Sequence, residues 1–150
     1  MKYWVGSFIL VAMVILSSHV AYAEAGKENE PCKTRVPADQ LAAAKAEKNP
    51  YEGNAAAVAE GKEIFEGKGT CFTCHGLEGK GDGIAGAALD PGPRNFTNSK
   101  FWECKSSGEM LWVIRNGSPG TAMIPAVSTG ILTEDEAKKV NAYERTFKGK

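Results

Sequence analysis

The sequence predicts an all-α domain, and the prediction rests on three segments in which apolar residues recur at helical spacing. These segments, residues 54–66, 106–117 and 133–147, each open on a residue type that favours helix N-caps. In the last two, a glutamate follows the cap by three residues and completes a capping box. No βαβ pattern interrupts them. The chain has 150 residues, which is enough for one domain around one hydrophobic core.

The first 23 residues have the three parts of a secretory signal peptide. Lys2 gives a positive start, residues 5–16 are apolar, and residues 21–23 form a small-residue cleavage site. The apolar run is too short for a comfortable membrane span. We therefore expect export to the periplasm and removal of residues 1–23. An uncleaved leader that anchors the chain in the membrane is the alternative.

An N-terminal extension, residues 24–53, separates this leader from the first strong helical pattern. Its prolines, Pro31, Pro37 and Pro50, surround an alanine-rich stretch over residues 38–48 that favours a helix. The sequence of the extension indicates no function of its own.

The first of the three helical segments begins after Asn54, which can cap a helix. Val58, Gly61, Ile64 and Phe65 then fall on one face. A glycine inside a helix costs about 1 kcal/mol relative to alanine. Gly61 therefore indicates either a weak position or the close approach of a second helix.

The run Cys71-Phe72-Thr73-Cys74-His75 has the attachment pattern of a covalently bound c-type haem, heme c. In this pattern the two thiols add to the porphyrin vinyl groups, and the imidazole that follows them reaches the iron. A thioredoxin-like dithiol needs no following histidine and expects a βαβ context, which is missing. A zinc site needs further cysteine or histidine ligands at short spacing, and none follow. We therefore expect one covalent haem held by Cys71 and Cys74, with His75 as an iron ligand.

The second iron ligand has few candidates, because the only other histidine, His19, lies in the expected leader. They are Met110, Met123, a lysine, or no side chain at all. Met110 lies within the capped segment 106–117 and is interpreted as core packing. Met123 lies between glycines and prolines that prevent regular structure, so a loop carries it. A loop thioether can lie across a haem face, where soft sulfur binds iron and raises the reduction potential, so Met123 is favoured.

Residues 76–101 are rich in glycine and proline and are predicted to form a loop. The glycine cluster at residues 79–83 does not predict a phosphate-binding loop, because no strand precedes it and the G-x-x-x-x-G-K-[ST] order is absent.

The closing segment, residues 133–147, repeats one set of positions at helical spacing. These positions are occupied by Ala137, Val140, Tyr143, Glu144 and Phe147. Glu144 is the polar exception on an otherwise apolar face.

The C-x-x-C-H run ending at His75, the Gly-Thr-Ala-Met loop ending at Met123 and the closing helix together resemble a class I monohaem cytochrome c of bacterial type. The likeness spans roughly residues 54–147. It implies a cytochrome c fold in which three to five helices wrap around one covalently bound haem, in a domain over residues 54–150 with the extension outside it. Ile124 departs from many relatives, in which proline directly follows the ligand methionine.

The resemblance also implies two sets of contacts. A small residue and two aromatic residues bring the first and last helices close together, and Gly61, Phe65 and Tyr143 match them. A proline carbonyl accepts a hydrogen bond from the proximal histidine, which orients its ring. Pro93 is the matching residue, with Pro91 as the second choice.

Charged side chains near the expected haem have two interpretations each. The planar fork of Arg94 would pair with a haem propionate, or Arg94 is an ordinary surface arginine. Five lysines form either a ring that steers an acidic redox partner or an ordinary solvated surface. They are Lys62, Lys68, Lys80, Lys100 and Lys105.

Cys32 and Cys104 are the two cysteines that haem attachment does not use. After export both would lie in an oxidising compartment, so the economical interpretation is a disulfide that fastens the extension to the loop before the middle helix. Two independent thiols, one of them bonded to a partner, are the alternative.

The chain carries 18 Lys+Arg and 18 Asp+Glu without a basic stripe, which argues against nucleic acid as a partner. With both axial iron positions filled, substrate has no vacant site, so we expect a monomeric one-electron carrier and no enzyme. Redox proteins are the expected donor and acceptor, and membrane association is expected only if the leader is kept. The alternatives are a haem enzyme or ligand-binding cytochrome with an open or displaceable sixth position, and a haem subunit of a larger redox complex.

Overall fold

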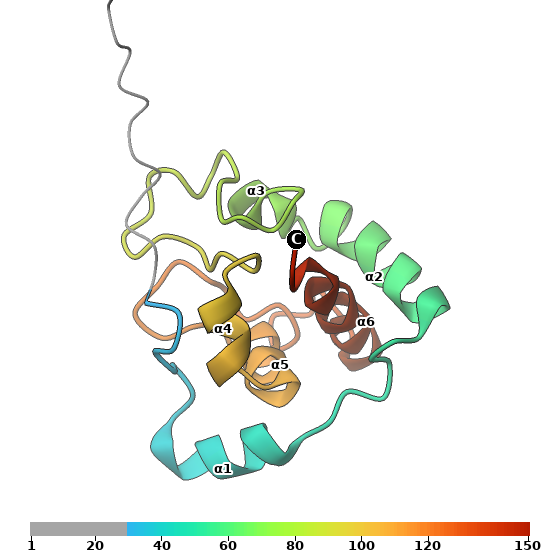
Figure 1. Ribbon diagram of the computed structural model, residues 1–150, viewed down its shortest axis with the longest axis horizontal. Helices are drawn as coiled ribbons and strands as arrows, with labels where there is room; N and C mark the ends of the chain where they lie inside the picture. Colours follow the sequence, from blue (N-terminus) through green and yellow to red (C-terminus); the bar gives the residue numbers. More distant parts are fainter. Residues whose placement is uncertain (1–29) are drawn as a thin grey trace, which may run out of the picture.

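A computed structural model describes residues 30–150, so the expected signal peptide and the first residues of the extension lie outside the described part. The described part is built from helices and loops, which confirms the all-α prediction (Figure 1). Its helices are α1 (Ala38–Ala46), α2 (Ala55–Glu66), α3 (Phe72–His75), α4 (Ser99–Cys104), α5 (Ser107–Asn116), α6 (Glu134–Glu144) and the 3-10 helix η1 (Arg145–Phe147). Within residues 30–150, no helix combines the length and apolarity that a membrane crossing requires.

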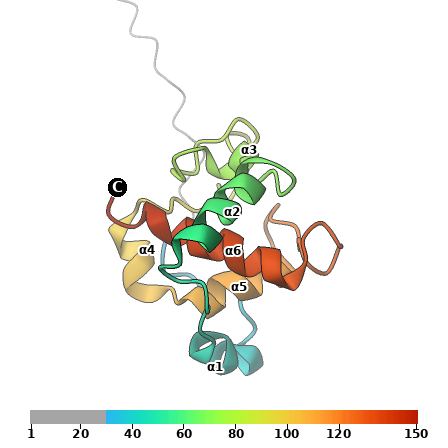
Figure 2. The same ribbon diagram turned by 90° about the vertical axis from the view of Figure 1, so that its right-hand side faces the viewer.

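Helices α2 and α6 cross in close contact, with α2 in front of α6 in the view of Figure 2. The approach is possible because Gly61 has no side chain: a Cβ there would lie 2.0 Å from the carbonyl oxygen of Lys139. Phe65 packs edge-on against Tyr143, with ring centroids 5.3 Å apart. The helix crossing implied by the cytochrome c resemblance is therefore confirmed.

The helix starts follow the capping residues that the sequence predicts. The side chain of Asn54 accepts a hydrogen bond from the first turn of α2. Ser106 and Glu109 form a complete capping box at α5, and Thr133 and Glu136 form another at α6. Because these caps satisfy backbone N–H groups that have no partner within the helix, they fix where each helix begins.

The extension contributes helix α1, which lies against α5 (Figure 1). This helix ends at Ala46, slightly before the predicted residue 48. Just beyond it, Glu47 pairs with the Arg115 guanidinium of α5 at 2.6 Å, and the same guanidinium pairs with Glu134 of α6. One arginine thus joins the extension to the last helix through α5.

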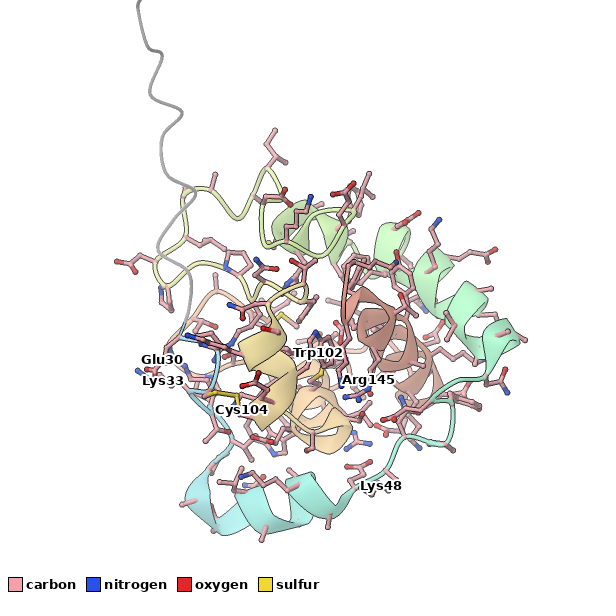
Figure 3. The ribbon with its side chains drawn as sticks, in the orientation of Figure 1. Glu30, Lys33, Lys48, Trp102, Cys104 and Arg145 are labelled. Atoms are coloured by element: carbon pink, nitrogen blue, oxygen red, sulfur yellow. A yellow bond between two sulfur atoms is a disulfide. The ribbon has the colours of Figure 1, made fainter. Side chains whose placement is uncertain are left out.

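Helix α4 corrects the sequence analysis, which assigns residues 76–101 to a loop and so includes the first residues of this helix. The side chain of Asn98 caps it. Trp102 of α4 is buried and donates its indole N–H to the Phe96 carbonyl at 2.5 Å. The guanidinium of Arg145 lies over the Trp102 ring, 5.0 Å from its centroid (Figure 3). The rest of the stretch, including residues 79–83, is loop as predicted.

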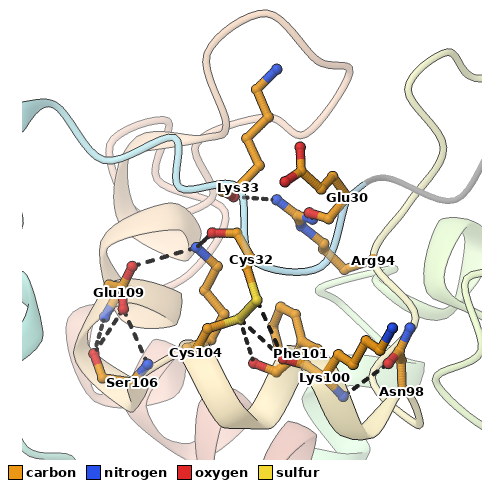
Figure 4. The surroundings of a disulfide bond; sticks show 11 residues. Glu30, Cys32, Lys33, Arg94, Asn98, Lys100, Phe101, Cys104, Ser106 and Glu109 are labelled. Carbon is orange, nitrogen blue, oxygen red and sulfur yellow. Dashed lines mark hydrogen bonds and ion pairs between the residues drawn. A yellow bond between two sulfur atoms is a disulfide. The ribbon is translucent and has the colours of Figure 1, made fainter.

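Cys32 of the extension and Cys104 at the end of α4 lie together in Figure 4. Their Cα atoms are 5.5 Å apart, within the range that a disulfide spans. Beside them, the Lys105 ammonium donates to the Cys32 carbonyl at 3.1 Å. The extension therefore meets the helical core at the position that the sequence analysis selects for a covalent link.

Candidate functional site

A cavity of about 310 Å³ lies between the C-x-x-C-H segment, the Met123 loop, α5, α6 and the extension. Its wall is mostly apolar, as in pockets for small molecules and cofactors. Every residue that the sequence analysis assigns to haem binding lines it. These residues are Cys71, Cys74, His75, Pro93, Arg94 and Met123. Folding therefore brings three segments that are well separated in sequence to one cavity.

The two thiols are positioned by α3, a single helical turn that the chain enters through Thr70, a residue with a positive φ of 50°. Cys71 precedes this turn, Cys74 lies within it, and the His75 amide donates to the Cys71 carbonyl at 2.9 Å. One turn thus carries all three groups to the cavity. Burial raises the pKa of the Cys71 thiol to about 12, and the nearby Glu144 carboxylate adds to this effect. Cys71 is therefore a protonated thiol in the polypeptide.

His75 is buried and its ring is held on two sides. Nδ1 lies 3.1 Å from the carbonyl oxygen of Arg94, which assigns the ring proton to Nδ1. Phe96 stacks on the imidazole with ring centroids 4.6 Å apart. Burial lowers the pKa of His75 to about 4, so the imidazole is neutral at pH 7. Nε2 then keeps its lone pair, the form in which histidine binds a metal.

The carbonyl that faces His75 corrects one prediction. The sequence analysis assigns it to Pro93, with Pro91 as the second choice, whereas the structure gives it to Arg94. The Phe96 amide donates to a carbonyl of the glycine cluster at 2.7 Å and fixes the register of this loop. In that register the Arg94 carbonyl reaches the imidazole. The prediction was one residue early because such a register depends on pairings between loops.

Met123 lies on a loop, as predicted, and backbone bonds hold that loop in place. The Ser118 amide donates to the Met123 carbonyl at 3.0 Å, and the Ala126 amide donates to the Ile114 carbonyl of α5 at 2.9 Å. Gly117 opens the loop with a φ of 78°, and a Cβ there would lie 2.8 Å from the Met123 carbonyl oxygen. The loop is therefore closed on itself by the Ser118–Met123 bond and fastened to α5 by the Ala126–Ile114 bond, with Met123 in the cavity wall.

Met110 also borders the cavity, although α5 carries it. It is buried and packs in the same hydrophobic cluster as Leu111 and Ile114. This placement agrees with its interpretation as core packing. Both thioethers that the sequence analysis weighs as iron ligands therefore reach the same space.

Two arginines border the cavity with different partners. The Arg94 guanidinium donates hydrogen bonds to the backbone carbonyls of Glu30 and Lys33 in the extension. This is the guanidinium that the sequence analysis considers as a partner of a haem propionate. Arg35, from the extension, donates through Nη1 to the Pro119 carbonyl at 3.0 Å. Its Nε is buried and has no hydrogen-bond partner among residues 30–150. An anionic group in the cavity would satisfy this buried donor, which otherwise costs free energy.

Comparison with known proteins decides the family of this chain. The family model of cytochrome c matches residues 58–148, which is more than half of the chain. The chain belongs to the cytochrome c family. A search of curated proteins found no match to this cytochrome.

Two solved structures show how far the likeness of this cytochrome extends. A chain of the Kuenenia stuttgartiensis reducing HAO-like protein complex Kustc0457/Kustc0458 is 30% identical, with a TM-score of 0.56. That match covers 65% of this cytochrome and 46% of the other chain, so this cytochrome spans about half the length of that relative. The second structure is cytochrome CL from the marine methylotrophic bacterium Methylophaga aminisulfidivorans MPT, which is 20% identical with a TM-score of 0.51. The match covers 72% of this chain and 65% of that chain. The latter likeness shows a shared fold.

Membership of the family implies a covalent c-type haem, and Cys71 and Cys74 have the spacing of its attachment motif. The cavity fits such a group. It offers two thiols outside any disulfide, a neutral imidazole, a loop thioether and, at Arg35, a buried donor that lacks an acceptor. An iron porphyrin with anionic propionates matches each of these features.

Sequence reasoning missed two kinds of residue in the cavity wall. Arg35 and Val36 come from the extension, outside the range that the family model matches. No spacing in the sequence connects them to the haem motif. Glu144 comes from α6, and a signal for it exists: it lies on the face of the closing helix that the sequence analysis assigns to the core.

Proposed function

We propose that this cytochrome c is a one-electron carrier whose haem is held by Cys71 and Cys74, with His75 and Met123 as the iron ligands. One observation carries the proposal: a single cavity is lined by both thiols, a buried neutral imidazole and a loop thioether. Nitrogen and sulfur ligands of these kinds suit iron in a haem that exchanges electrons.

The side chains around the cavity have separate tasks in this proposal. The Arg94 carbonyl holds the Nδ1 proton of His75 and so directs Nε2 to the metal. The anchored loop presents the Met123 sulfur, a soft ligand that favours the reduced state. When bound, the haem supplies reversible one-electron exchange. If His75 and Met123 both bind the iron, no iron position would be left for a substrate, as expected of a carrier.

The proposal includes export and two redox partners. The leader pattern of residues 1–23 supports a periplasmic location, an oxidising compartment in which a Cys32–Cys104 disulfide can form. A redox protein would donate the electron and another would accept it. The carrier would act as a monomer.

The ligand assignment is tested with paired methionine variants of the haem-loaded protein. We expect the oxidised wild type to show the weak near-infrared sulfur-to-iron charge-transfer band of Met-ligated cytochromes. Met123→Ala should abolish the band and allow the reduced protein to bind carbon monoxide. Met110→Leu, a volume-conserving change in the same cavity wall, should keep the band. Loss of the band in Met110→Leu alone would transfer the ligand role to Met110.

A second candidate function is a haem subunit of a larger redox complex. It is favoured by the 30% identity to a chain that belongs to such a complex. In that case the purified protein would be recovered with other chains under mild extraction, whereas a free carrier would be recovered alone.

A further inference from the structure

Glu144 is a buried carboxylic acid in the cavity wall that the proposed haem ligation does not use. It is the last residue of α6, and only 5% of it is exposed. Cys71 lines the same cavity, and the charge of the Glu144 carboxylate helps to raise the pKa of its thiol. Since Cys71 is a proposed haem attachment point, Glu144 lies next to the space that the haem would fill.

The charged groups on the elements around Glu144 are engaged elsewhere. On α6 and η1, Lys139 pairs with Glu60 at 2.7 Å, and Arg145 approaches Glu52 at 3.8 Å. On α2, Glu66 interacts with the Tyr143 hydroxyl and, together with burial, raises its pKa. Among the other charged groups of the cavity wall, Lys105 pairs with Glu109 of α5 at 3.5 Å, and Arg35 and Arg94 donate to backbone carbonyls. None of these groups contributes to the charge state of Glu144, which burial and Asn141 determine.

One polar neighbour remains on the same helix. The Asn141 side chain, one turn earlier, favours the charged carboxylate, but its Nδ2 has no partner at hydrogen-bonding distance within residues 30–150. Its oxygen accepts from Asn49 of the extension at 2.9 Å. Burial therefore dominates and raises the pKa of Glu144 to about 8. A carboxyl whose pKa is raised in this way would exchange its proton near neutral pH.

We propose that Glu144 binds a proton when the haem iron is reduced and releases it when the iron is oxidised, so that this cytochrome couples electron transfer to proton transfer. The inference rests on the proposed function. On reduction, one electron arrives from the redox-protein donor and one proton arrives from water, and the proton forms an O–H bond at a Glu144 carboxylate oxygen. On oxidation, one electron leaves to the acceptor and that O–H bond gives its proton back to water.

The direction of the coupling follows from charge. An oxidised iron centre carries one positive charge more than a reduced one, and it attracts the carboxylate more strongly. In a poorly solvated cavity this attraction is weakly screened. Reduction removes part of it, so the cost of burying the carboxylate is no longer offset and the proton is bound. The proton affinity of Glu144 is therefore higher in the reduced protein.

The experiment is a redox titration of the haem-loaded protein at a series of pH values. We expect the wild-type midpoint potential to fall as pH rises through the neutral and mildly alkaline range. The slope should approach about 59 mV per pH unit, which is the potential that corresponds to a tenfold change in the equilibrium constant of a one-electron reaction. Glu144→Gln, which keeps the shape and removes the titration, should flatten that slope. Glu144→Leu should do the same. Glu63→Gln removes an equal charge from the exposed surface of α2 and should keep the wild-type slope.

A redox-difference infrared spectrum gives an independent readout. The C=O stretch of a protonated carboxylic acid should appear on reduction in the wild type and be absent in Glu144→Gln. A reversible couple whose potential does not change with pH in the wild type, or an unchanged slope in Glu144→Gln, would overturn the inference. Failure to find any reversible one-electron couple would instead contradict the proposed function.

Discussion

At Gly61 the lack of a side chain sets the distance between the first and last helices of the cytochrome c domain. A Cβ at this position would lie 2.0 Å from the Lys139 carbonyl oxygen and 3.1 Å from the Cβ of Tyr143. The backbone oxygen cannot move away without shifting α6. The helix-propensity cost of a glycine is therefore accepted here because it permits a close crossing.

Gly61→Ala gives a test in which two effects have opposite signs. Helix propensity alone would stabilise the variant by about 1 kcal/mol. The steric clash should outweigh this, and we expect the free energy of unfolding to fall by about 2 kcal/mol, within the usual range for overpacking. Denaturant unfolding of the haem-loaded protein, followed by circular dichroism, measures the change. As a reference, Ala59→Gly on the exposed side of α2 should cost only about 1 kcal/mol. A stabilised Gly61→Ala protein would show that the two helices can separate freely.

The haem motif and its surroundings differ in how well they could be predicted residue by residue. Cys71, Cys74 and His75 form one helical turn, so their spacing alone defines their arrangement. The Arg94 carbonyl reaches His75 through a loop register, and Glu144 reaches the cavity through the packing of α6. Interactions across the fold place those two groups, and a sequence pattern does not encode such distances.

At the scale of elements, prediction succeeded where local chemistry determines the helix ends. The capping boxes that start α5 and α6 consist of residues three apart, and both occur in the structure as predicted. Helix α4 was missed because six residues are too few to show an apolar periodicity. Its buried residues, Phe101 and Trp102, face the core through tertiary packing, which overrides the weak local signal.

The extension is an element whose attachment can be tested directly. Cys32 and Cys104 are separated by 72 positions in the sequence, and a disulfide between them would restrict a long loop of the unfolded chain. In the chain-entropy model this restriction stabilises the fold by about 4 kcal/mol. We expect the Cys32→Ser/Cys104→Ser double variant to lose an amount of this order in denaturant unfolding, while its haem spectrum stays that of the wild type.

The single variants control for the loss of each side chain. If the bond forms, Cys32→Ser and Cys104→Ser should each lose about as much stability as the double variant, because either substitution removes the same bond. Alkylation of the unfolded, unreduced wild-type protein should then label neither cysteine. Labelling of both would show two independent thiols and contradict the proposed link.

At the scale of the whole molecule, the cavity is a product of segments that the sequence keeps far apart. Met123, His75 and Glu144 reach it from a loop, from α3 and from α6. The extension completes the wall with Arg35 and Val36, although it lies outside the region that the family model matches. The family pattern therefore predicted the haem attachment and the core helices, while the part of the wall that lies outside the matched region became visible only in three dimensions.

The surface charges bear on how this cytochrome meets its redox partners. Four of the five lysines that the sequence analysis weighs as a docking ring lie beside carboxylates. Their pairs are Lys62–Glu66 at 3.9 Å, Lys68–Glu136 at 2.7 Å, Lys80–Glu78 at 2.5 Å and Lys105–Glu109 at 3.5 Å. The chain as a whole has a formal net charge of zero. Both features weaken a long-range field that would steer an acidic partner.

We therefore expect electron exchange with small charged reagents to depend weakly on salt. The rate constant with an anionic iron cyanide complex should change less than about tenfold as ionic strength rises from low to physiological values, below the range of strongly steered reactions. Glu78→Gln frees the half-exposed Lys80 and should make that rate faster at low salt and more salt-dependent, because a cation then lacks its nearby anion. Glu103→Gln removes the same charge from an exposed site on α4 and should give a smaller change. Stopped-flow measurement of the rate constant for all three proteins separates the effect of the local ion pair from that of net charge. A steep decline of the wild-type rate constant with salt would contradict this expectation and support the five lysines as a docking surface.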